Sequence, residues 1–258
     1  MSKKFLLALD AGHGLYTEGK RCLKSIDPNE TREWILNDRI SKYIENRAKT
    51  YKGFEIIRVD DETGKTDVSL RTRCQKANNS GADFYLSNHH NAGINGGSGG
   101  GVVAFCMRGA SESTKNWRDE LYNAVVSAGK LKGNRTDPTQ EVNYNVLVWS
   151  DMPAVLIEYG FMDSTVDVKY ILSEEYAKTV GFAVADCIAK LAGLEKNEMD
   201  EELEPVKKFN TFDELPEYGK ETIQKLIETN ALKGTGNGLE ISEDMLRILV
   251  ILDRLGKL

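Results

Sequence analysis

The chain contains 258 residues, 40% of them apolar and 29% charged, which is the composition of a folded globular protein rather than of a disordered or fibrous one. Its net charge of −6 is concentrated between residues 195 and 204, where six acidic side chains accompany one lysine, so the rest of the chain is nearly neutral. This distribution argues against the broad basic surface that nucleic-acid binding requires, and no stretch reaches the ~18 apolar residues of a membrane span.

Two further features concern the compartment in which the chain is made. The apolar run 5–9 ends at Asp10, so it is shorter than the ~7–15 apolar residues of a secretory signal. Four cysteines lie far apart and form no C-x-x-C pair, which indicates reduced thiols rather than a disulfide framework or a thiolate metal site. We therefore expect synthesis in the cytoplasm without a signal peptide.

Short apolar runs alternate with helical patterns along residues 1–194. The runs predict six buried strands, at 5–9, 54–59, 84–86, 102–106, 146–148 and 154–157. Between the first two, Leu36, Ile40 and Ile44 recur at helical spacing, and a last helical pattern at 171–191 ends before Gly193. This alternation predicts an α/β fold with a mostly parallel six-stranded sheet and helices on both of its faces.

The end of the chain is expected to form a second, small domain. The acidic segment 195–206 is predicted to be a linker, because it lacks apolar periodicity and closes with Pro205. Residues 207–258 predict two helices around a glycine-rich turn; Ser242 caps the second, whose apolar stripe is Met245, Leu246, Leu249 and Val250. Two short helices make a small core, so we expect this mainly helical domain to lean on a partner surface or on a second copy of itself.

The chain has three histidines, and each follows a predicted strand. His13 comes after the first strand within Asp-Ala-Gly-His-Gly, and His89 and His90 come after the third. The carboxyl ends of strands border the ligand crevice of an open α/β sheet, so imidazoles distant in sequence can meet there. The glycines beside His13 would let another group approach its imidazole closely.

Two carboxylates could act together with these histidines, one as a metal ligand and the other in proton transfer. A catalytic zinc site needs about three nitrogen or oxygen ligands and an open position for water. Glu33 is the candidate ligand, because it shares with Leu36 and Ile40 the helix face expected to pack on the sheet; Glu30 is the alternative if the helix begins earlier. Glu158 directly follows the last apolar run, and near zinc it could move a proton from water to a leaving nitrogen.

Four motifs occur in order over residues 4 to about 192. They are Asp-Ala-Gly-His-Gly at 10–14, Glu33 with Asn37, Ser87-x-His89-x-Asn91, and the run from Pro153 to Phe161 that contains Glu158. Together they resemble the zinc-dependent N-acetylmuramoyl-L-alanine amidase family, which includes phage and prophage endolysins.

The resemblance implies one zinc ion held by His13, Glu33 and His89, with Glu158 as the catalytic general acid and base. It also implies that zinc-activated water hydrolyses the amide bond between N-acetylmuramic acid and L-alanine in bacterial peptidoglycan. An endolysin made in the cytoplasm would reach this substrate after release through a membrane lesion.

Other positions of these motifs are expected to bind no metal. His90 and Asn88 are not ligands in the family, and we expect His90 at the rim of the site. Arg73 and Asn78 match positions in the helix before the third strand, where structural roles are expected.

The glycine run 96–101 leads into a strand rather than a helix, which argues against a phosphate-binding loop and predicts a flexible edge of a groove.

Two other functions remain as alternatives. A zinc peptidase acting on peptidoglycan stem peptides, of the metallocarboxypeptidase type, would carry a glutamate three residues after its first histidine, where this chain has Tyr16. A non-catalytic wall-binding protein is the other alternative, although all four candidate residues are retained. The C-terminal domain resembles in part the S-layer-homology type of wall-binding module, but it is a single copy and lacks the closing Thr-Arg-Ala-Glu stretch. Cell-wall binding is therefore one expected role, and oligomerisation is the competing one.

Overall fold

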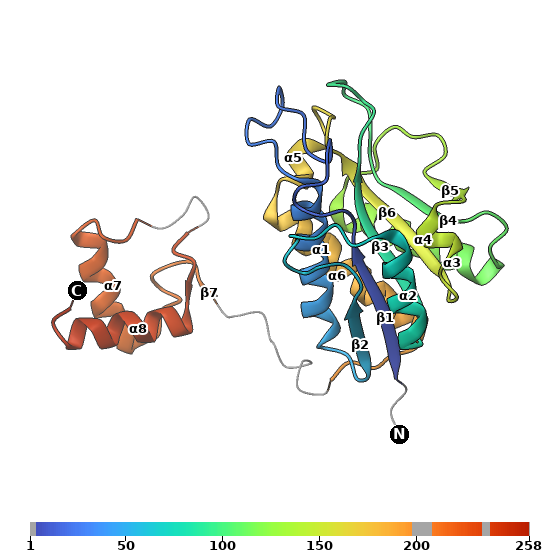
Figure 1. The fold of residues 1–258 in the computed structure, drawn as a ribbon. Coiled ribbons are helices and arrows are strands. Elements are labelled where there is room, and N and C mark those ends of the chain that lie inside the picture. Colours follow the sequence, from blue (N-terminus) through green and yellow to red (C-terminus); the bar gives the residue numbers. More distant parts are fainter. Residues whose placement is uncertain (1–3, 198–207, 234–237, 258) are drawn as a thin grey trace. The chain divides into compact units, whose positions relative to one another are not determined.

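The computed structural model describes residues 4–197, 208–233 and 238–257 (Figure 1). It divides into two compact units, Met1–Asn197 and Glu198–Leu258. The predicted linker lies outside the described residues from 198 onward. Its first residues belong to the first unit, because the carbonyl of Glu195 accepts a hydrogen bond from the N–H of Lys52 and the N–H of Asn197 donates to the carbonyl of Thr50.

The first unit is built on a six-stranded sheet with the strand order β2-β1-β3-β6-β4-β5. Its strands are β1 (Phe5–Ala11), β2 (Phe54–Arg58), β3 (Phe84–Asn91), β4 (Val103–Met107), β5 (Thr139–Val142) and β6 (Ala154–Phe161). The first four strands of this order are mutually parallel, whereas β4 pairs antiparallel with β6 and parallel with β5. The predicted mostly parallel sheet is confirmed.

One of the six strands is not where the sequence predicted it. Residues 146–148 belong to a short helix, α4 (Asn145–Val148), in which Val146 and Leu147 are buried. The missing strand is β5, whose residues are half-buried and form no apolar run. A short apolar run reports burial, and periodicity alone cannot distinguish a buried helical turn from a strand.

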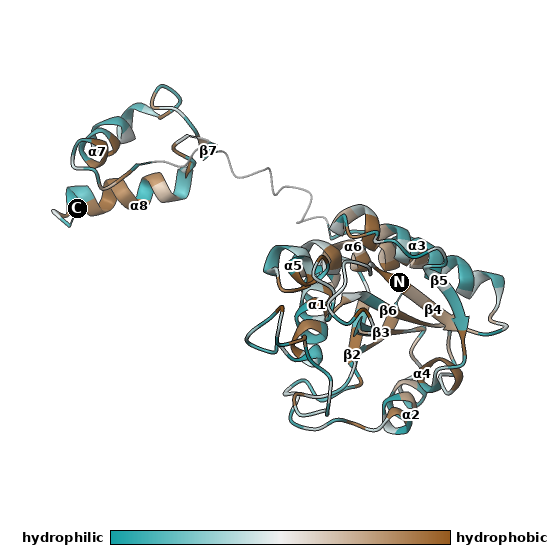
Figure 2. Cartoon of the chain, turned by 90° about the horizontal axis from the view of Figure 1, so that it is seen from above, coloured by the Kyte–Doolittle hydropathy of each residue, from teal (hydrophilic) through white to brown (hydrophobic). Residues whose placement is uncertain are grey.

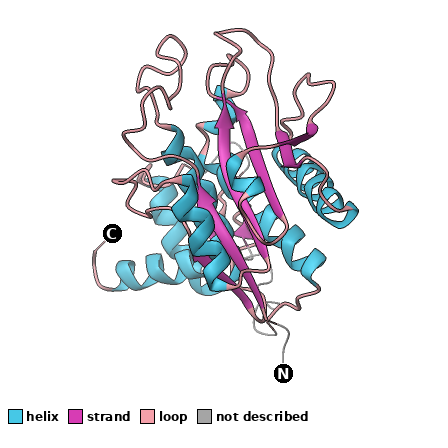
Figure 3. Cartoon of the chain, turned by 45° about the vertical axis from the view of Figure 1, so that its right-hand side comes forward, coloured by secondary structure: helices cyan, strands magenta, loops and turns pink. Residues whose placement is uncertain are grey.

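Helices cover both faces of this sheet (Figure 3). On one face lie α1 (Glu33–Ala48), α3 (Glu112–Gly129) and α6 (Glu174–Ala192), and on the other lie α2 (Leu70–Ser80) and α4. Side chains alternate between the two cores along each strand, so Leu7 and Leu9 enter the core under α1 and Ala8 enters the other. The short α5 (Val168–Ile171) precedes α6, which ends at Gly193 in a left-handed cap, as predicted.

The second unit has a small core of its own. It comprises β7 (Lys208–Phe209), α7 (Glu217–Glu228), β8 (Ile241–Ser242) and α8 (Glu243–Arg254), and its buried apolar residues are Phe209, Leu215, Ile223, Ile241, Leu246 and Val250. Ser242 caps α8 as predicted, because its side chain accepts a hydrogen bond from the N–H of Met245 at 3.2 Å. Met245 is itself 45% exposed and does not belong to the buried stripe. Most of the predicted glycine-rich turn, residues 234–237, lies outside the described residues.

All four cysteines are buried and free. Within the described part of the chain, none of the helices combines the length and the apolar character needed to cross a membrane.

Candidate metal centre and active site

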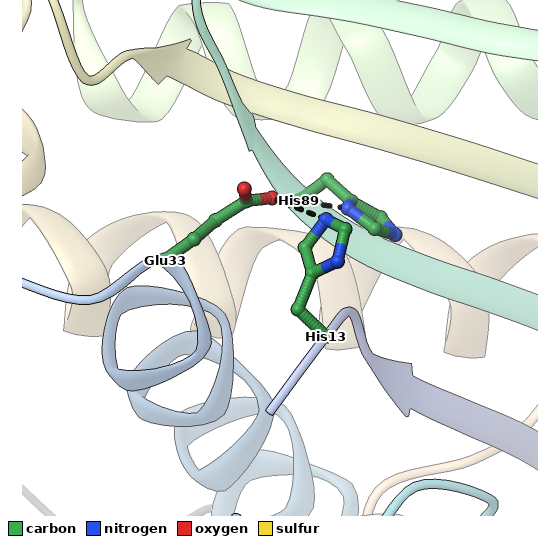
Figure 4. A group of neighbouring side chains, drawn as sticks. All are labelled: His13, Glu33 and His89. Atoms are coloured by element: carbon green, nitrogen blue, oxygen red, sulfur yellow. Dashed lines mark hydrogen bonds and ion pairs between the residues drawn. The ribbon is translucent and has the colours of Figure 1, made fainter. Parts of the chain in front are cut away.

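Three side chains from separate elements converge at the carboxyl edge of the sheet (Figure 4). Glu33 begins α1, His13 follows β1, and His89 lies near the end of β3. Their candidate ligand atoms lie within 4.8 Å of one another. Glu33 Oε1 is 3.1 Å from His89 Nδ1 and 3.4 Å from His13 Nε2. Two imidazole nitrogens and one carboxylate oxygen form a donor set that suits a catalytic zinc ion.

The backbone around His13 is shaped so that the two imidazoles can meet. A Cβ atom at Gly12 would lie 2.0 Å from His89 Cε1, so only glycine leaves room for the His89 ring. His13 itself has a left-handed φ of 67°, which is uncommon for a residue with a side chain. Arg73 holds this turn, because its guanidinium donates hydrogen bonds to the carbonyls of Ala11 and His13, each at 2.8 Å.

A buried polar row on α1 attaches the helix to the strands that carry the histidines. The row consists of Glu33, Asn37 and Ser41, which are spaced four residues apart and therefore lie on one side of the helix. Asn37 donates a hydrogen bond to the carbonyl of Gly12 at 3.1 Å, and its side-chain oxygen is 2.8 Å from His90 Nδ1. Ser41 accepts a hydrogen bond from Asn88 at 2.9 Å. The ligand-bearing elements are thus fixed to one another by side-chain hydrogen bonds.

Two expectations about this region are wrong. His90 is buried beneath the site rather than at its rim, because alternation along β3 turns it towards α1. Burial lowers the pKa of His90 to about 3, so its ring is neutral. Glu30 is not an alternative ligand, because α1 begins only at Glu33 and Glu30 forms ion pairs with Arg21 and Lys24.

Glu158 lies beside the three converging residues on the neighbouring strand. It is within β6 rather than directly after a strand, and it pairs in register with His89, so both side chains are on the same face of the sheet. Among the described residues, its buried Oε2 atom has no hydrogen-bond partner. Burial raises the pKa of Glu158 to about 7, with the charge of Glu33 acting in the same direction. A carboxyl group with such a pKa can exchange a proton near neutral pH.

A cavity of about 320 Å³ opens next to the histidines. His13 and His89 form part of its wall, and residues 67–70, which lead into α2, form another part. The two histidines are therefore accessible to a small chemical group from this side.

A family model described as N-acetylmuramoyl-L-alanine amidase matches residues 7–190, a range that contains every residue of this site. The chain belongs to this family. Among curated relatives, the amidase CwlM of Bacillus licheniformis is 32% identical over 192 residues, which cover 73% of this chain and 69% of that protein. The endolysin of Bacillus phage SPP1 is 29% identical over 198 residues, which cover 76% of this chain and 68% of that protein.

Solved structures agree with this assignment. The N-acetylmuramoyl-L-alanine amidase from Clostridium difficile 630 has a TM-score of 0.64 and 29% sequence identity, covering 73% of this chain and 97% of that one. The shared fold is that of the first unit, which contains the converging side chains.

Sequence reasoning missed one charged residue of the amidase site. Lys20 Nζ is 3.6 Å from Glu33 Oε2, and the Lys20 carbonyl accepts a hydrogen bond from the N–H of Glu33 at 3.0 Å. The positive charge of Lys20 also acts to lower the pKa of Glu158. No spacing pattern marks a single lysine in a polar loop. The role of Ser41, in contrast, could have been inferred, because it continues the spacing of Glu33 and Asn37.

The remaining positions of the amidase motifs make structural contacts. The side chain of Asn78 donates a hydrogen bond to the carbonyl of Trp149 at 3.0 Å.

The end of the glycine run 96–101 is packed and is not the predicted flexible edge, because the N–H of Gly101 donates a hydrogen bond to Asp167 at 2.7 Å. A Cβ atom at Gly101 would lie 2.3 Å from the Lys132 carbonyl, so a close approach of two backbone segments requires glycine there.

Proposed function

We propose that the chain is a wall-lytic amidase that hydrolyses the bond between N-acetylmuramic acid and L-alanine in peptidoglycan, with zinc held by His13, Glu33 and His89. The observation that carries the proposal is the convergence of these three side chains in a member of the amidase family. Similarity to the SPP1 endolysin supports a lytic role in the cell wall.

The residues fit a zinc ion. Burial acts to raise the pKa of Glu33, but hydrogen bonds with His13 and His89 hold that pKa well below its ordinary value, so the carboxylate is negatively charged. Among the described residues, Glu33 Oε2 is buried without a hydrogen-bond partner. Buried polar atoms are rarely left unsatisfied, so a buried carboxylate with Oε1 beside two imidazoles and Oε2 3.6 Å from Lys20 Nζ, without a hydrogen bond, is consistent with a cation site.

The side chains divide the chemistry between them. Bound zinc would supply a Lewis acid, which polarises the amide carbonyl and makes water a better nucleophile at neutral pH. The Glu158 carboxylate accepts a proton from the attacking water and then delivers it to the nitrogen of the departing L-alanine. The carbon–nitrogen bond breaks, and the products are a carboxylic acid on the sugar side and a free amine on the peptide side.

The variant Glu158→Gln tests this proposal. Glutamine preserves the shape of the side chain but cannot accept the proton, so we expect hydrolysis of purified peptidoglycan to fall by about 10²- to 10⁴-fold. Zinc content should be unchanged. Glu62→Gln, which alters an exposed carboxylate of the same unit, is the matched control and should retain full activity.

Product analysis in the same assay separates the amidase from its rivals. An amidase exposes the amino group of L-alanine and releases no carboxy-terminal amino acid, whereas a carboxypeptidase does the reverse. Release of free amino acids by the unmodified chain would contradict the proposed substrate bond. Undiminished hydrolysis by Glu158→Gln would contradict the role of Glu158.

We propose in addition that the second unit is a separate non-catalytic module. It has its own apolar core, and the metal-binding residues all lie in the first unit. Wall binding and self-association are the two roles expected for such a module. Wall binding would require hydrogen-bonding or aromatic groups on the surface of α8, whereas self-association would require an apolar surface.

A further inference from the structure

The outer face of α8 carries exposed aliphatic side chains that pack on nothing within the described part of the second unit. Leu246 and Val250 point into the core of the second unit, whereas Ile248, Ile251 and Leu255 are 58%, 56% and 65% exposed. These three follow one another at spacings of three and four residues and therefore form one continuous row. We call this row the outer stripe. The core of the second unit explains why Leu246 and Val250 are apolar, but it does not explain why the outer stripe is apolar.

The outer stripe is unusual for a helix that faces water. A surface helix normally turns its apolar residues inward and its polar residues outward, whereas α8 has exposed aliphatic residues in addition to its core residues. Figure 2 shows much of α8 in the hydrophobic colour. The neighbouring helix α7 shows the ordinary pattern, because its outer face is mostly polar, with Glu221, Gln224, Lys225 and Glu228 exposed. The outer stripe therefore indicates a contact surface that is formed by α8 and not by α7.

The chemistry of the stripe argues against a glycan or a membrane as its partner. Sugars are recognised by hydrogen bonds and aromatic faces, and α8 has neither an aromatic side chain nor an amide side chain. Membrane-surface helices combine an apolar face with a basic polar face. The described part of the second unit carries nine acidic and seven basic side chains, so it has no excess positive charge to attract an anionic bilayer.

The charges at the two ends of α8 are complementary to each other. Asp244 lies one turn before Ile248 in line with the outer stripe, in the acidic first turn of the helix, whereas Arg254 lies in its last turn. Within the described residues, neither of these two side chains has an ion-pair partner. An antiparallel second α8 would bring Asp244 of each helix to Arg254 of the other, whereas Asp253 of the same last turn is already paired with Lys225 of its own unit. A parallel arrangement would place like charges together.

We propose that α8 is a self-association surface, on which the outer stripes of two copies of the chain pack antiparallel around a two-fold axis. In such an interface the same patch is used on both copies. The stripes would bury their aliphatic side chains against each other, while Asp244 of each copy pairs with Arg254 of the other. The proposal does not depend on amidase activity.

Sedimentation of the full chain over a wide micromolar range of concentrations tests the proposal. The unmodified chain should convert from monomer to dimer as its concentration rises. Ile248→Arg should raise the dimer dissociation constant about tenfold or more, because a charge would be buried between the stripes. Ile227→Arg, which changes a partly exposed isoleucine on α7, is the matched control and should dimerise like the unmodified chain.

Exchanging the end charges tests the antiparallel arrangement. Asp244→Arg alone and Arg254→Asp alone should each weaken the dimer, whereas the double variant should restore it, because opposite charges again face each other. Asp213→Arg changes the net charge equally outside α8 and should have no effect. Circular dichroism on each variant separates loss of association from loss of helix.

Three results would overturn the proposal. The first is a monomeric mass at every concentration, and the second is a double variant that dimerises no better than the single ones. The third is a monomeric chain in which Ile248→Arg abolishes binding to purified cell walls or to phosphatidylglycerol vesicles. That result would assign the outer stripe to one of those partners instead.

Discussion

At the scale of single residues, the metal centre depends most on Glu33. Its Oε1 atom faces both imidazoles and accepts a hydrogen bond from the N–H of His90, while its Oε2 atom faces Lys20. The two oxygens therefore have different environments: Oε1 lies beside the histidines, whereas Oε2 lies 3.6 Å from Lys20 Nζ. Charged and hydrogen-bonded partners of a metal ligand set its orientation and its affinity for the ion.

Replacement of Lys20 tests whether this contact positions Glu33. In Lys20→Met we expect zinc affinity, measured by competition with a chromophoric chelator, to fall by about 10- to 100-fold. Lys20→Arg should restore part of the loss because it retains the charge. Lys24→Met removes the nearby ion pair with Glu30 and should bind zinc like the unmodified chain. Unchanged affinity in Lys20→Met would show that the lysine has no positioning role.

At the scale of elements, the sequence predicts the residues that lie in motifs, but it does not predict the strand segments that carry polar residues. The sequence indicates His13, Glu33, His89 and Glu158 because they sit in ordered motifs, and the structure places them together or side by side. The position of His90 was missed because β3 continues beyond its apolar run into polar residues, where the apolar pattern no longer marks a strand. The strand β5 was missed for the same reason.

The junction of β1 and β3 offers a test at this scale. Gly12→Ala would place a methyl group inside the volume of the His89 ring, so we expect loss of zinc binding and of activity while the fold is retained. Gly99→Ala is the matched control, because the nearest atom to its added methyl group would be 3.4 Å away, an ordinary contact. Normal zinc binding by Gly12→Ala would contradict the close approach of these segments.

At the scale of the whole molecule, each unit has its own core, and the first also buries a charged cluster. Arg73 pairs with Asp10, which in addition accepts hydrogen bonds from Tyr85 at 2.9 Å and from Ser87 at 2.8 Å. The cluster links α2, β1 and β3 beneath the turn that carries His13. Burial acts to raise the pKa of Asp10, but the charges of Arg73 and His89 and the hydrogen bonds from Arg73 and Ser87 lower that pKa overall.

This lowered pKa predicts a pH dependence of stability. Ionised Asp10 stabilises the fold fully above its ordinary pKa of 3.8, and the contribution is lost as the pH falls through the lower pKa of the folded state. Asp10→Asn should reduce the free energy of unfolding at neutral pH by about 3–5 kcal/mol, because Arg73 loses its buried partner. Urea unfolding should show this difference shrinking in strongly acidic buffer. A difference that stays constant with pH would contradict the assignment.

The central claim is that His13, Glu33 and His89 hold one zinc ion, and anomalous diffraction at the zinc absorption edge from a zinc-loaded crystal tests it most directly. We predict a single strong peak at about 2.0–2.2 Å from one atom of each of these three side chains. No peak there, or a peak held by other residues, would contradict the account.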